Sequence, residues 1–483
     1  MSLDAEDVIR VEGRYLVRGD NKDRFFVRGI AFPDAPPTRL ITEENGQHIQ
    51  YNATGWISIL QQLRDSSDEL NTIRLYQLDD PSLVDYSEFF HAAADLGFYI
   101  LVPLTATFGN AILNRALPAP HCYTKALWGY GTRMLHFALD HPNVIAGIIG
   151  NEVMNSIESW RAAPCIKAYA RDLKQYMKSQ LLTDHKYKQR GALIPLMYAA
   201  QDSGIGAALS NVDTIRLTVD YLSCRHHNNA KDDASVDILG VNLESWCSSY
   251  NTFETNMDGT PGIMFQMWQG LHTSVHAPLV FSELGCSHSR FNRDSPEFPG
   301  GGTRDWTEVP VVLQEMADTW SGFCSFAYWG NSLFNMMSGG PWNGRDVLIP
   351  TRDFENFQQQ CAIGTQQKEQ QSALVGSVVP GSLHDLPMQN GGIMESYYQS
   401  LAQNPHTQPT CAQVEEALAK TCKLELYDFE KMPSYYSMSG WWFLVVMILA
   451  VSCAAVAGFW WSRQRQRGTY ERIPDPEPTT SQF

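Results

Sequence analysis

The sequence lacks an excess of basic residues, with 36 Lys and Arg against 52 Asp and Glu and a formal net charge of −16. Since phosphate binding needs a basic surface, we expect no nucleic acid partner. No two of the ten cysteines have the CxxC spacing of a zinc site or a redox motif. We therefore expect no metal, and nothing in the sequence indicates a cofactor.

One long apolar segment stands near the C-terminal end. Gly440–Trp461 contains no charged residue and is long enough to cross a hydrocarbon layer of ~30 Å. Tryptophans at both of its ends are typical of interfacial belts, and three arginines follow directly. These features predict a single transmembrane helix over 440–461 and a cytosolic tail over 462–483. The large N-terminal part would then lie outside the plasma membrane, at the cell surface.

The first twenty residues lack an apolar core of signal-peptide length. Either a leader precedes this sequence, or the chain inserts by its tail and the large domain faces the cytosol. Nine cysteines lie before the membrane segment, and widely spaced cysteines commonly form disulfides in secreted domains. We therefore expect a leader, although each cysteine could instead be a small buried hydrophobe. The sequon Asn52-Ala53-Thr54 fits a lumenal location, with glycosylation at Asn52.

A strand-like apolar run followed by a helical stretch recurs along the first three quarters of the chain. The runs are Phe25–Phe32, Thr72–Leu78, Tyr99–Thr105, Val144–Glu152, Ile194–Ala200, Ile238–Ser245, Leu279–Gly285 and Ser325–Asn331. Helical spacing occurs in Trp56–Leu63, Tyr86–Leu96, Cys165–Leu181 and Pro310–Trp320. Near-continuous apolar runs are typical of parallel strands covered on both faces. The alternation predicts an α/β fold, a (β/α)8 TIM barrel, with an open doubly wound sheet as the alternative.

The character of the sequence changes after the barrel region. Glycine, serine and proline are frequent over 372–392, which is typical of a linker. We therefore divide the chain into a catalytic domain over 11–362, a linker and small cysteine-containing juxtamembrane region over 363–435, the membrane helix and the tail.

Two predicted strands end in carboxylates. Glu152 closes the fourth run, directly after Asn151, and Glu283 lies at the end of the seventh. In such barrels the chemistry sits at the C-terminal ends of the strands, where two carboxylates can flank a sugar–sugar bond. We predict that Glu152 is the general acid/base and Glu283 the nucleophile. The alternative is that each glutamate caps the next helix, since carboxylates favour helix N-termini.

Three aromatic residues lie at or just past predicted strand ends: Tyr76, Trp246 and Trp329. Flat rings in these places could stack on the apolar face of a sugar, and we predict them as substrate-binding residues. The alternative is that they form the core at the top of the barrel.

The sequence resembles glycoside hydrolase family 72, the fungal β-1,3-glucanosyltransferases of cell walls. The similar segments, in the family's order and spacing, are Asn71–Tyr76, Gly147–Asn155, Ala170–Ser179, Asp237–Cys247, Pro278–Cys286 and Asp318–Tyr328. The resemblance extends from Val11 to Ala362, so it covers the catalytic domain. It implies a retaining barrel enzyme that cleaves inside a β-1,3-glucan chain and passes the new reducing end to a glucan acceptor.

The resemblance also assigns roles to individual residues. It implies that Glu152 is the acid/base, that Glu283 is the nucleophile, and that Asn151 and Tyr76 line the cleavage site. It further implies two disulfides, Cys247–Cys286 and Cys224–Cys361.

The sequence departs from the family pattern at several positions that contact sugar. Pro103 stands where the family has an aspartate, and Glu244 and Leu284 stand where it has tyrosines. Glu244 would add a third carboxylate near the pair if its side chain points inward. Two alternatives to a transglycosylase therefore stay open: a β-1,3-glucan hydrolase, and a catalytically inactive, membrane-anchored glucan-binding protein.

Overall fold

The computed structural model describes the chain from residue 7 to residue 366, with gaps. The gaps are 34–37, 44–45, 52, 107–108, 157, 184–189, 191, 202–210, 224–232, 245, 247–251, 256–258, 273–274, 276, 288–302, 330–332 and 340–347. The predicted linker region, membrane helix and tail lie outside these residues. Every helix in the described part is too short or too polar to cross a bilayer.

Eight parallel strands form a closed barrel, as predicted. In chain order they are β4 (Val27–Phe32), β7 (Thr72–Leu75), β8 (Tyr99–Pro103), β9 (Val144–Asn151), β10 (Leu196–Gln201), β11 (Ile238–Leu243), β12 (Leu279–Leu284) and β13 (Trp320–Ser325). Each strand pairs with the next in the chain, and β13 pairs with β4 to close the ring. The open-sheet alternative is therefore wrong. Since sequential parallel strands meet in one ring, all of their C-terminal ends lie at the same face.

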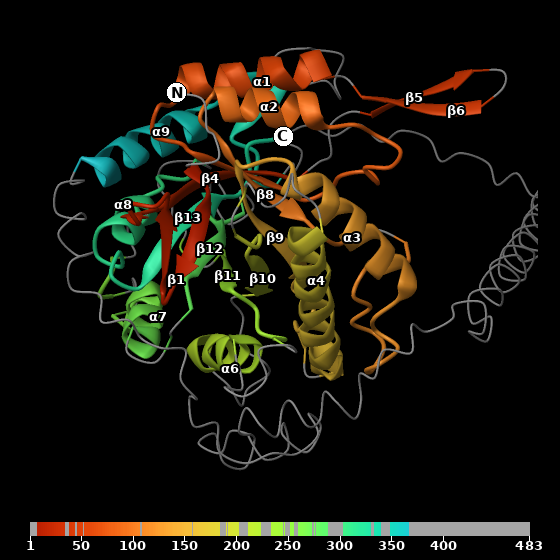
Figure 1. Cartoon of the computed structure of the whole chain (residues 1–483). Helices are drawn as coiled ribbons and strands as arrows, with labels where there is room; N and C mark the ends of the chain where they lie inside the picture. Colours follow the sequence, from red (N-terminus) through yellow and green to blue (C-terminus); the bar gives the residue numbers. More distant parts are fainter. Residues whose placement is uncertain are drawn as a thin grey trace, which may run out of the picture. The chain divides into compact units, whose positions relative to one another are not determined.

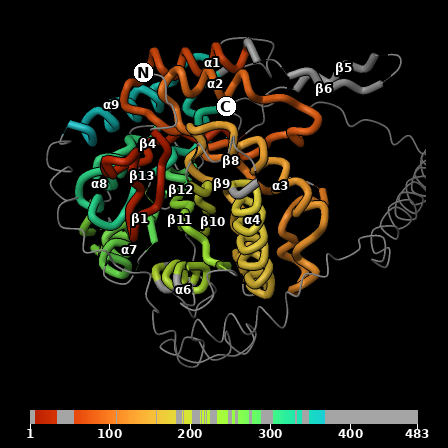
Figure 2. The backbone as a smooth tube through the Cα atoms, in the orientation of Figure 1, coloured from red at the N-terminus to blue at the C-terminus, as the bar shows by residue number. Residues whose placement is uncertain are grey.

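Helices follow the strands and pack around them (Figure 1). They are α1 (Ala53–Ser66), α2 (Ser87–Asp95), α3 (Lys125–Leu139), the 3-10 helix η2 (Glu158–Ala162), α4 (Ala163–Thr183), α6 (Asn211–Ser223), α7 (Ile263–Leu271), α8 (Glu308–Leu313) and α9 (Arg352–Thr365). In Figure 2, α3 and α4 lie on one side of the strands and α7 and α8 on the other. The first three predicted helices are confirmed as α1, α2 and α4.

The eighth strand and the helix before it differ from the prediction. The strand is Trp320–Ser325, not Ser325–Asn331, and α8 ends at Leu313 instead of continuing to Trp320. The apolar residues Tyr328 and Trp329 are buried after the strand, where they pack on Phe32. An apolar run was therefore a correct sign of burial, but it marked the loop that covers the barrel top and not the strand.

Shorter antiparallel elements that the sequence did not predict lie outside the barrel. They are β1 (Ile9–Glu12), β2 (Tyr15–Arg18), β3 (Asp23–Arg24), the hairpin of β5 (Thr38–Glu43) and β6 (Gly46–Tyr51), and the pair of β14 (Met337–Gly339) and β15 (Leu348–Pro350). Ile9 and Leu16 of the first sheet join one apolar cluster with Val27, Tyr99 and Ile145 of the barrel strands.

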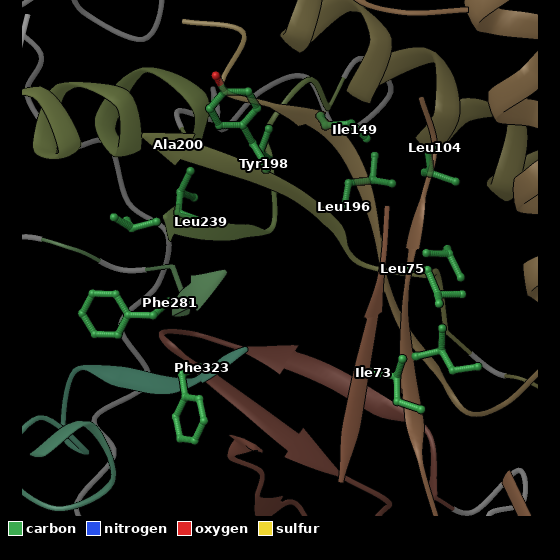
Figure 3. Packing of buried hydrophobic residues seen from close by; sticks show 14 of the residues in the cluster. Ile73, Leu75, Leu104, Ile149, Leu196, Tyr198, Ala200, Leu239, Phe281 and Phe323 are labelled. Carbon is green, nitrogen blue, oxygen red and sulfur yellow. The ribbon is translucent and has the colours of Figure 1, made fainter. Parts of the chain in front are cut away.

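Alternate residues of β8 pack in two different clusters, as the period of two requires, with Tyr99 and Leu101 in one and Ile100 and Val102 in the other. The larger cluster lies between strands and helices; Figure 3 shows part of it, with Ile73 and Leu75 on β7, Leu239 on β11 and Phe281 on β12. Arg74 lies between Ile73 and Leu75 on β7 and is 1% exposed. The strand pattern that buries Ile73 and Leu75 thus directs a charged side chain into the barrel.

A second buried arginine joins the C-terminal ends of the last two strands. The Arg304 guanidinium donates to the carbonyl oxygens of Phe326, after β13, at 2.6 Å and of Cys286, after β12, at 3.3 Å. It also forms an ion pair of 2.6 Å with Asp353 in the first turn of α9. Trp306 donates its indole N–H to the same carboxylate at 2.8 Å. One buried ion pair therefore connects α9 to the loops that frame the top of the barrel.

Breaking this pair is expected to destabilise the fold strongly. Arg304→Ala leaves the Asp353 carboxylate buried without its cation, which costs about 3–5 kcal/mol of unfolding free energy. The exposed pair of Arg10 and Asp20 provides the control, and Arg10→Ala should cost at most about 1 kcal/mol. Urea unfolding of the three proteins measures both changes, and equal losses in the two variants would contradict the structural role of the buried pair.

Candidate active site

Glu283 lies on β12 with a buried carboxyl group, 5% exposed. Two donors from β7 and the residue after it reach its Oε1: Nη1 of Arg74 at 3.2 Å and the hydroxyl of Tyr76 at 2.8 Å. The Arg74 guanidinium also lies 4.2 Å from the centre of the Tyr76 ring. The carboxylate is therefore fixed by one charged and one neutral donor that support each other.

Burial raises the pKa of Glu283 above its usual range. The charge of Arg74 and the hydrogen bond from Tyr76 oppose this shift and lower the pKa, whereas the negative charge of Glu152 raises it further. Burial also raises the pKa of Tyr76 well above its usual value, so its hydroxyl keeps the proton that it donates. The two donors hence offset part of the free-energy cost of keeping the Glu283 carboxylate ionised in a desolvated site.

Glu152 follows the last residue of β9 and is partly exposed. Its Oε1 accepts a hydrogen bond of 2.9 Å from Nδ2 of Asn242 on β11. Its backbone has a φ of 49°. Residues other than glycine rarely adopt this conformation, which costs about 1 kcal/mol of folding free energy. Its amide donates to the carbonyl of Ala199 on β10 at 2.8 Å.

Asn151, Asn242 and Arg74 connect the two glutamates. Nη2 of Arg74 donates to Oδ1 of Asn151 at 2.7 Å, and Nδ2 of Asn242 donates to the same atom at 3.2 Å. Since arginine has no acceptor, its contact fixes the orientation of the Asn151 amide. Asn242 therefore contacts Glu152 directly and reaches Glu283 through Arg74, to which its Oδ1 is an acceptor at 3.4 Å. The predicted pair thus belongs to one hydrogen-bond network at the C-terminal ends of the strands.

Sequence reasoning missed Arg74 and Asn242 as site residues. Arg74 is the single charged residue of β7, Asn242 is the single polar residue of β11, and the neighbours of both are buried. A polar side chain in such a place must find partners inside the protein, because leaving it unpaired is costly. An arginine or asparagine between buried apolar residues of a parallel strand was therefore the signal that could have found them.

The structure places the other predicted substrate-binding residues in surroundings different from those of Tyr76 and Asn151. Trp246 is 2% exposed and donates its indole N–H to Thr307 at 3.2 Å, and Trp329 is 1% exposed and packs between Phe32 and Trp56. In this structure both therefore belong to the core at the barrel top, and their role as sugar platforms stays a prediction. Glu244 directly follows β11 and is partly exposed, and its role also stays a prediction.

One disulfide joins Cys122, in the loop before α3, to Cys165 on α4. The sequence did not predict this pairing. Of the two pairings that the resemblance implies, Cys247–Cys286 and Cys224–Cys361, one cysteine each, Cys247 and Cys224, lies outside the described residues. The predicted glycosylation site Asn52 lies outside them as well.

Comparison with known proteins identifies the family of this chain. Residues 1–363 match the glycoside hydrolase 72 family, described as glucanosyltransferase. The chain belongs to this family. Among its relatives, the 1,3-beta-glucanosyltransferase GAS5 of Saccharomyces cerevisiae is 24% identical over 72% of this chain and 61% of its own length. The 1,3-beta-glucanosyltransferase gel1 of Aspergillus fumigatus is 28% identical over 58% of this chain and 52% of its own length. The chain thus spans between half and two thirds of these family members.

Solved structures of the family share the fold. Gas2p of Saccharomyces cerevisiae in complex with laminaripentaose has a TM-score of 0.55 at 22% identity, covering 74% of this chain and 69% of that one. The same protein has also been solved with laminaritriose and laminaritetraose, with the same TM-score and identity. This chain therefore shares the fold of Gas2p.

Removing the Tyr76 hydroxyl should change the pH dependence of activity. Tyr76→Phe deletes a donor to the ionised form of Glu283, so the pKa of Glu283 rises further. Because attack needs the carboxylate, the acidic limb of kcat/KM should move to higher pH, with a loss of about tenfold at the optimum. Tyr15→Phe, which removes a hydroxyl bonded to the Asp318 carbonyl, should leave the profile unchanged. An unmoved acidic limb in Tyr76→Phe would contradict the assigned interaction.

Proposed function

We propose that this protein is a retaining β-1,3-glucan transglycosylase that cleaves a glucan chain internally and transfers the new end to another glucan. The observation that carries the proposal is the network that holds Glu152 and Glu283 at the ends of the fourth and seventh barrel strands. The names of the relatives, 1,3-beta-glucanosyltransferases, support the substrate and the reaction.

In the first step the Glu283 carboxylate attacks the anomeric carbon of the donor. The glycosidic C–O bond breaks, its electron pair stays on the leaving oxygen, and that oxygen takes the proton of the Glu152 carboxyl. Since Arg74 and Tyr76 both donate to Oε1 of Glu283, we assign the attack to Oε2. The product is a glycosyl ester of Glu283 and a free glucan fragment.

In the second step Glu152, now a carboxylate, takes the proton of an acceptor hydroxyl. The acceptor oxygen attacks the anomeric carbon, the ester bond breaks and Glu283 is restored. Two inversions at the same carbon retain its configuration. Asn151 is placed for the contact with the hydroxyl next to the reacting carbon, because Arg74 and Asn242 occupy its Oδ1 and leave its Nδ2 as the donor.

A product profile tests the reaction. The purified full-length protein in detergent is incubated with a reduced laminari-oligosaccharide, and products longer than the substrate are expected. Glu152→Gln and Glu283→Gln should each lower the rate at least about a hundredfold. Glu315→Gln, at an exposed glutamate on the segment after α8, is the control and should be as active as the unmodified protein. Only shorter products would identify a hydrolase, and glucan binding without turnover would identify a binding protein.

We also propose that one C-terminal helix, Gly440–Trp461, holds the enzyme in the plasma membrane with the catalytic domain outside. The length and apolar character of the segment and the arginines after it support this orientation. The disulfide between Cys122 and Cys165 supports it too, because disulfides persist in oxidising compartments.

Extraction of membranes tests the anchor. The full-length chain expressed in a fungal host should stay in the membrane pellet after alkaline carbonate treatment, and a chain that ends at Met432 should be released. Protease added to intact wall-less cells should remove the barrel and spare the tail. A full-length chain recovered in the carbonate supernatant would rule out the spanning helix.

A further inference from the structure

The loop between β8 and α3 contacts the backbone of Glu152. It carries Arg115, whose Nη1 donates to the carbonyl oxygen of Glu152 at 3.1 Å. The amide of Glu152 is bound on its other side by the carbonyl of Ala199. Two residues later the amide of Met154 donates to the hydroxyl of Tyr198 at 2.9 Å. The amide of Glu152 is thus held by the backbone of Ala199, and its carbonyl is held by the Arg115 side chain from a separate loop.

This loop is fastened to the start of α4 by a covalent bond and by hydrogen bonds. The disulfide joins Cys122 to Cys165, with a Cα–Cα distance of 6.0 Å and a sequence separation of 43. The amide of Ala119 donates to the carbonyl of Arg161 at 3.2 Å, and the guanidinium of Arg161 donates to the carbonyl of Ala116, next to Arg115. Within the loop, the amide of Asn114 donates to the carbonyl of Cys122 at 3.1 Å.

We infer that Arg115, held in place by the Cys122–Cys165 disulfide, is a positioning residue that aims the Glu152 carboxyl at the leaving oxygen. The inference rests on the proposed function, in which Glu152 is the acid/base. The positive φ of Glu152 sets the direction of its side chain, and this backbone conformation persists only where surrounding contacts enforce it. Asn242 holds the carboxylate, and Arg115 holds the backbone that carries it.

The nucleophile does not depend on this loop. Glu283 is held by Arg74 on β7 and by Tyr76 directly after it, through contacts that include neither Arg115 nor the disulfide. Loss of Arg115 should therefore weaken proton donation and leave nucleophilic attack intact. A displacement of about 1 Å at a catalytic group can cost about a hundredfold in rate.

Donors with two kinds of leaving group separate these effects. A sugar leaving group needs the proton of Glu152, whereas 2,4-dinitrophenolate leaves without one. In Arg115→Ala, kcat for cleavage of a laminari-oligosaccharide should fall roughly tenfold to a hundredfold, with KM little changed. The burst of dinitrophenolate from a dinitrophenyl laminari-oligosaccharide should change by less than about threefold. Arg115→Lys, which keeps a cationic donor, should recover part of the loss.

Two further variants complete the experiment. Cys122→Ser/Cys165→Ser should show the same split between the two donors as Arg115→Ala. Arg133→Ala, which like the Arg115 variant removes an exposed arginine, here one bonded to Asp80, should leave both rates unchanged. Equal losses on both donors in the Arg115 variants, or no loss on either, would overturn the positioning role.

The unmodified enzyme distinguishes failure of the proposed transglycosylase function from failure of the positioning role of Arg115. If it releases dinitrophenolate but forms no longer glucan, the transferase function fails, and the Arg115 effect is still measured by comparing aryl donors of good and poor leaving ability. If it turns over neither donor, Glu152 has no acid/base role and both proposals are overturned.

Discussion

The guanidinium of Arg74 lies inside the barrel, where water cannot solvate it, and donates to groups on three other strands. Its contacts are the Ser282 carbonyl and Glu283 on β12, Asn151 on β9, and Asn242 on β11. A cation in this place costs several kcal/mol unless it is paired and hydrogen-bonded. The site residues must therefore be present together, since each one satisfies a group that another would leave unpaired.

The two glutamates are held in different ways that suit the different tasks we propose for them. Glu283 is buried, and its partners are strand residues or directly follow a strand, so its position is set by the barrel itself. Glu152 is partly exposed, stands beyond the end of its strand and depends on side chains from β11 and from a loop. A nucleophile that attacks one fixed carbon needs little freedom, whereas an acid/base must meet first a leaving oxygen and then an acceptor.

Most of the fold was predictable because a parallel barrel strand is buried on both faces and reads as an apolar run. The prediction failed where burial and strand formation separate: Tyr328 and Trp329 are buried in a loop, and the true eighth strand includes buried serines such as Ser321. The location of Glu152 and Glu283 at the C-terminal face of the barrel could be predicted because both stand at strand ends. Arg74 and Asn242 could not, since their roles depend on contacts between strands far apart in sequence. The Cys122–Cys165 disulfide could not be predicted either, because the spacing of cysteines does not determine which of them pair.

The backbone of Glu152 bears on which residues this position tolerates. A position with positive φ is most stable as glycine or asparagine, so a glutamate there costs conformational free energy. Exchange for glycine would relieve this strain and would also remove the carboxylate that accepts a hydrogen bond from Asn242. The glutamate therefore keeps its hydrogen bond to Asn242 at the cost of a strained backbone, as Trp306, with a φ of 58°, keeps its bond to Asp353.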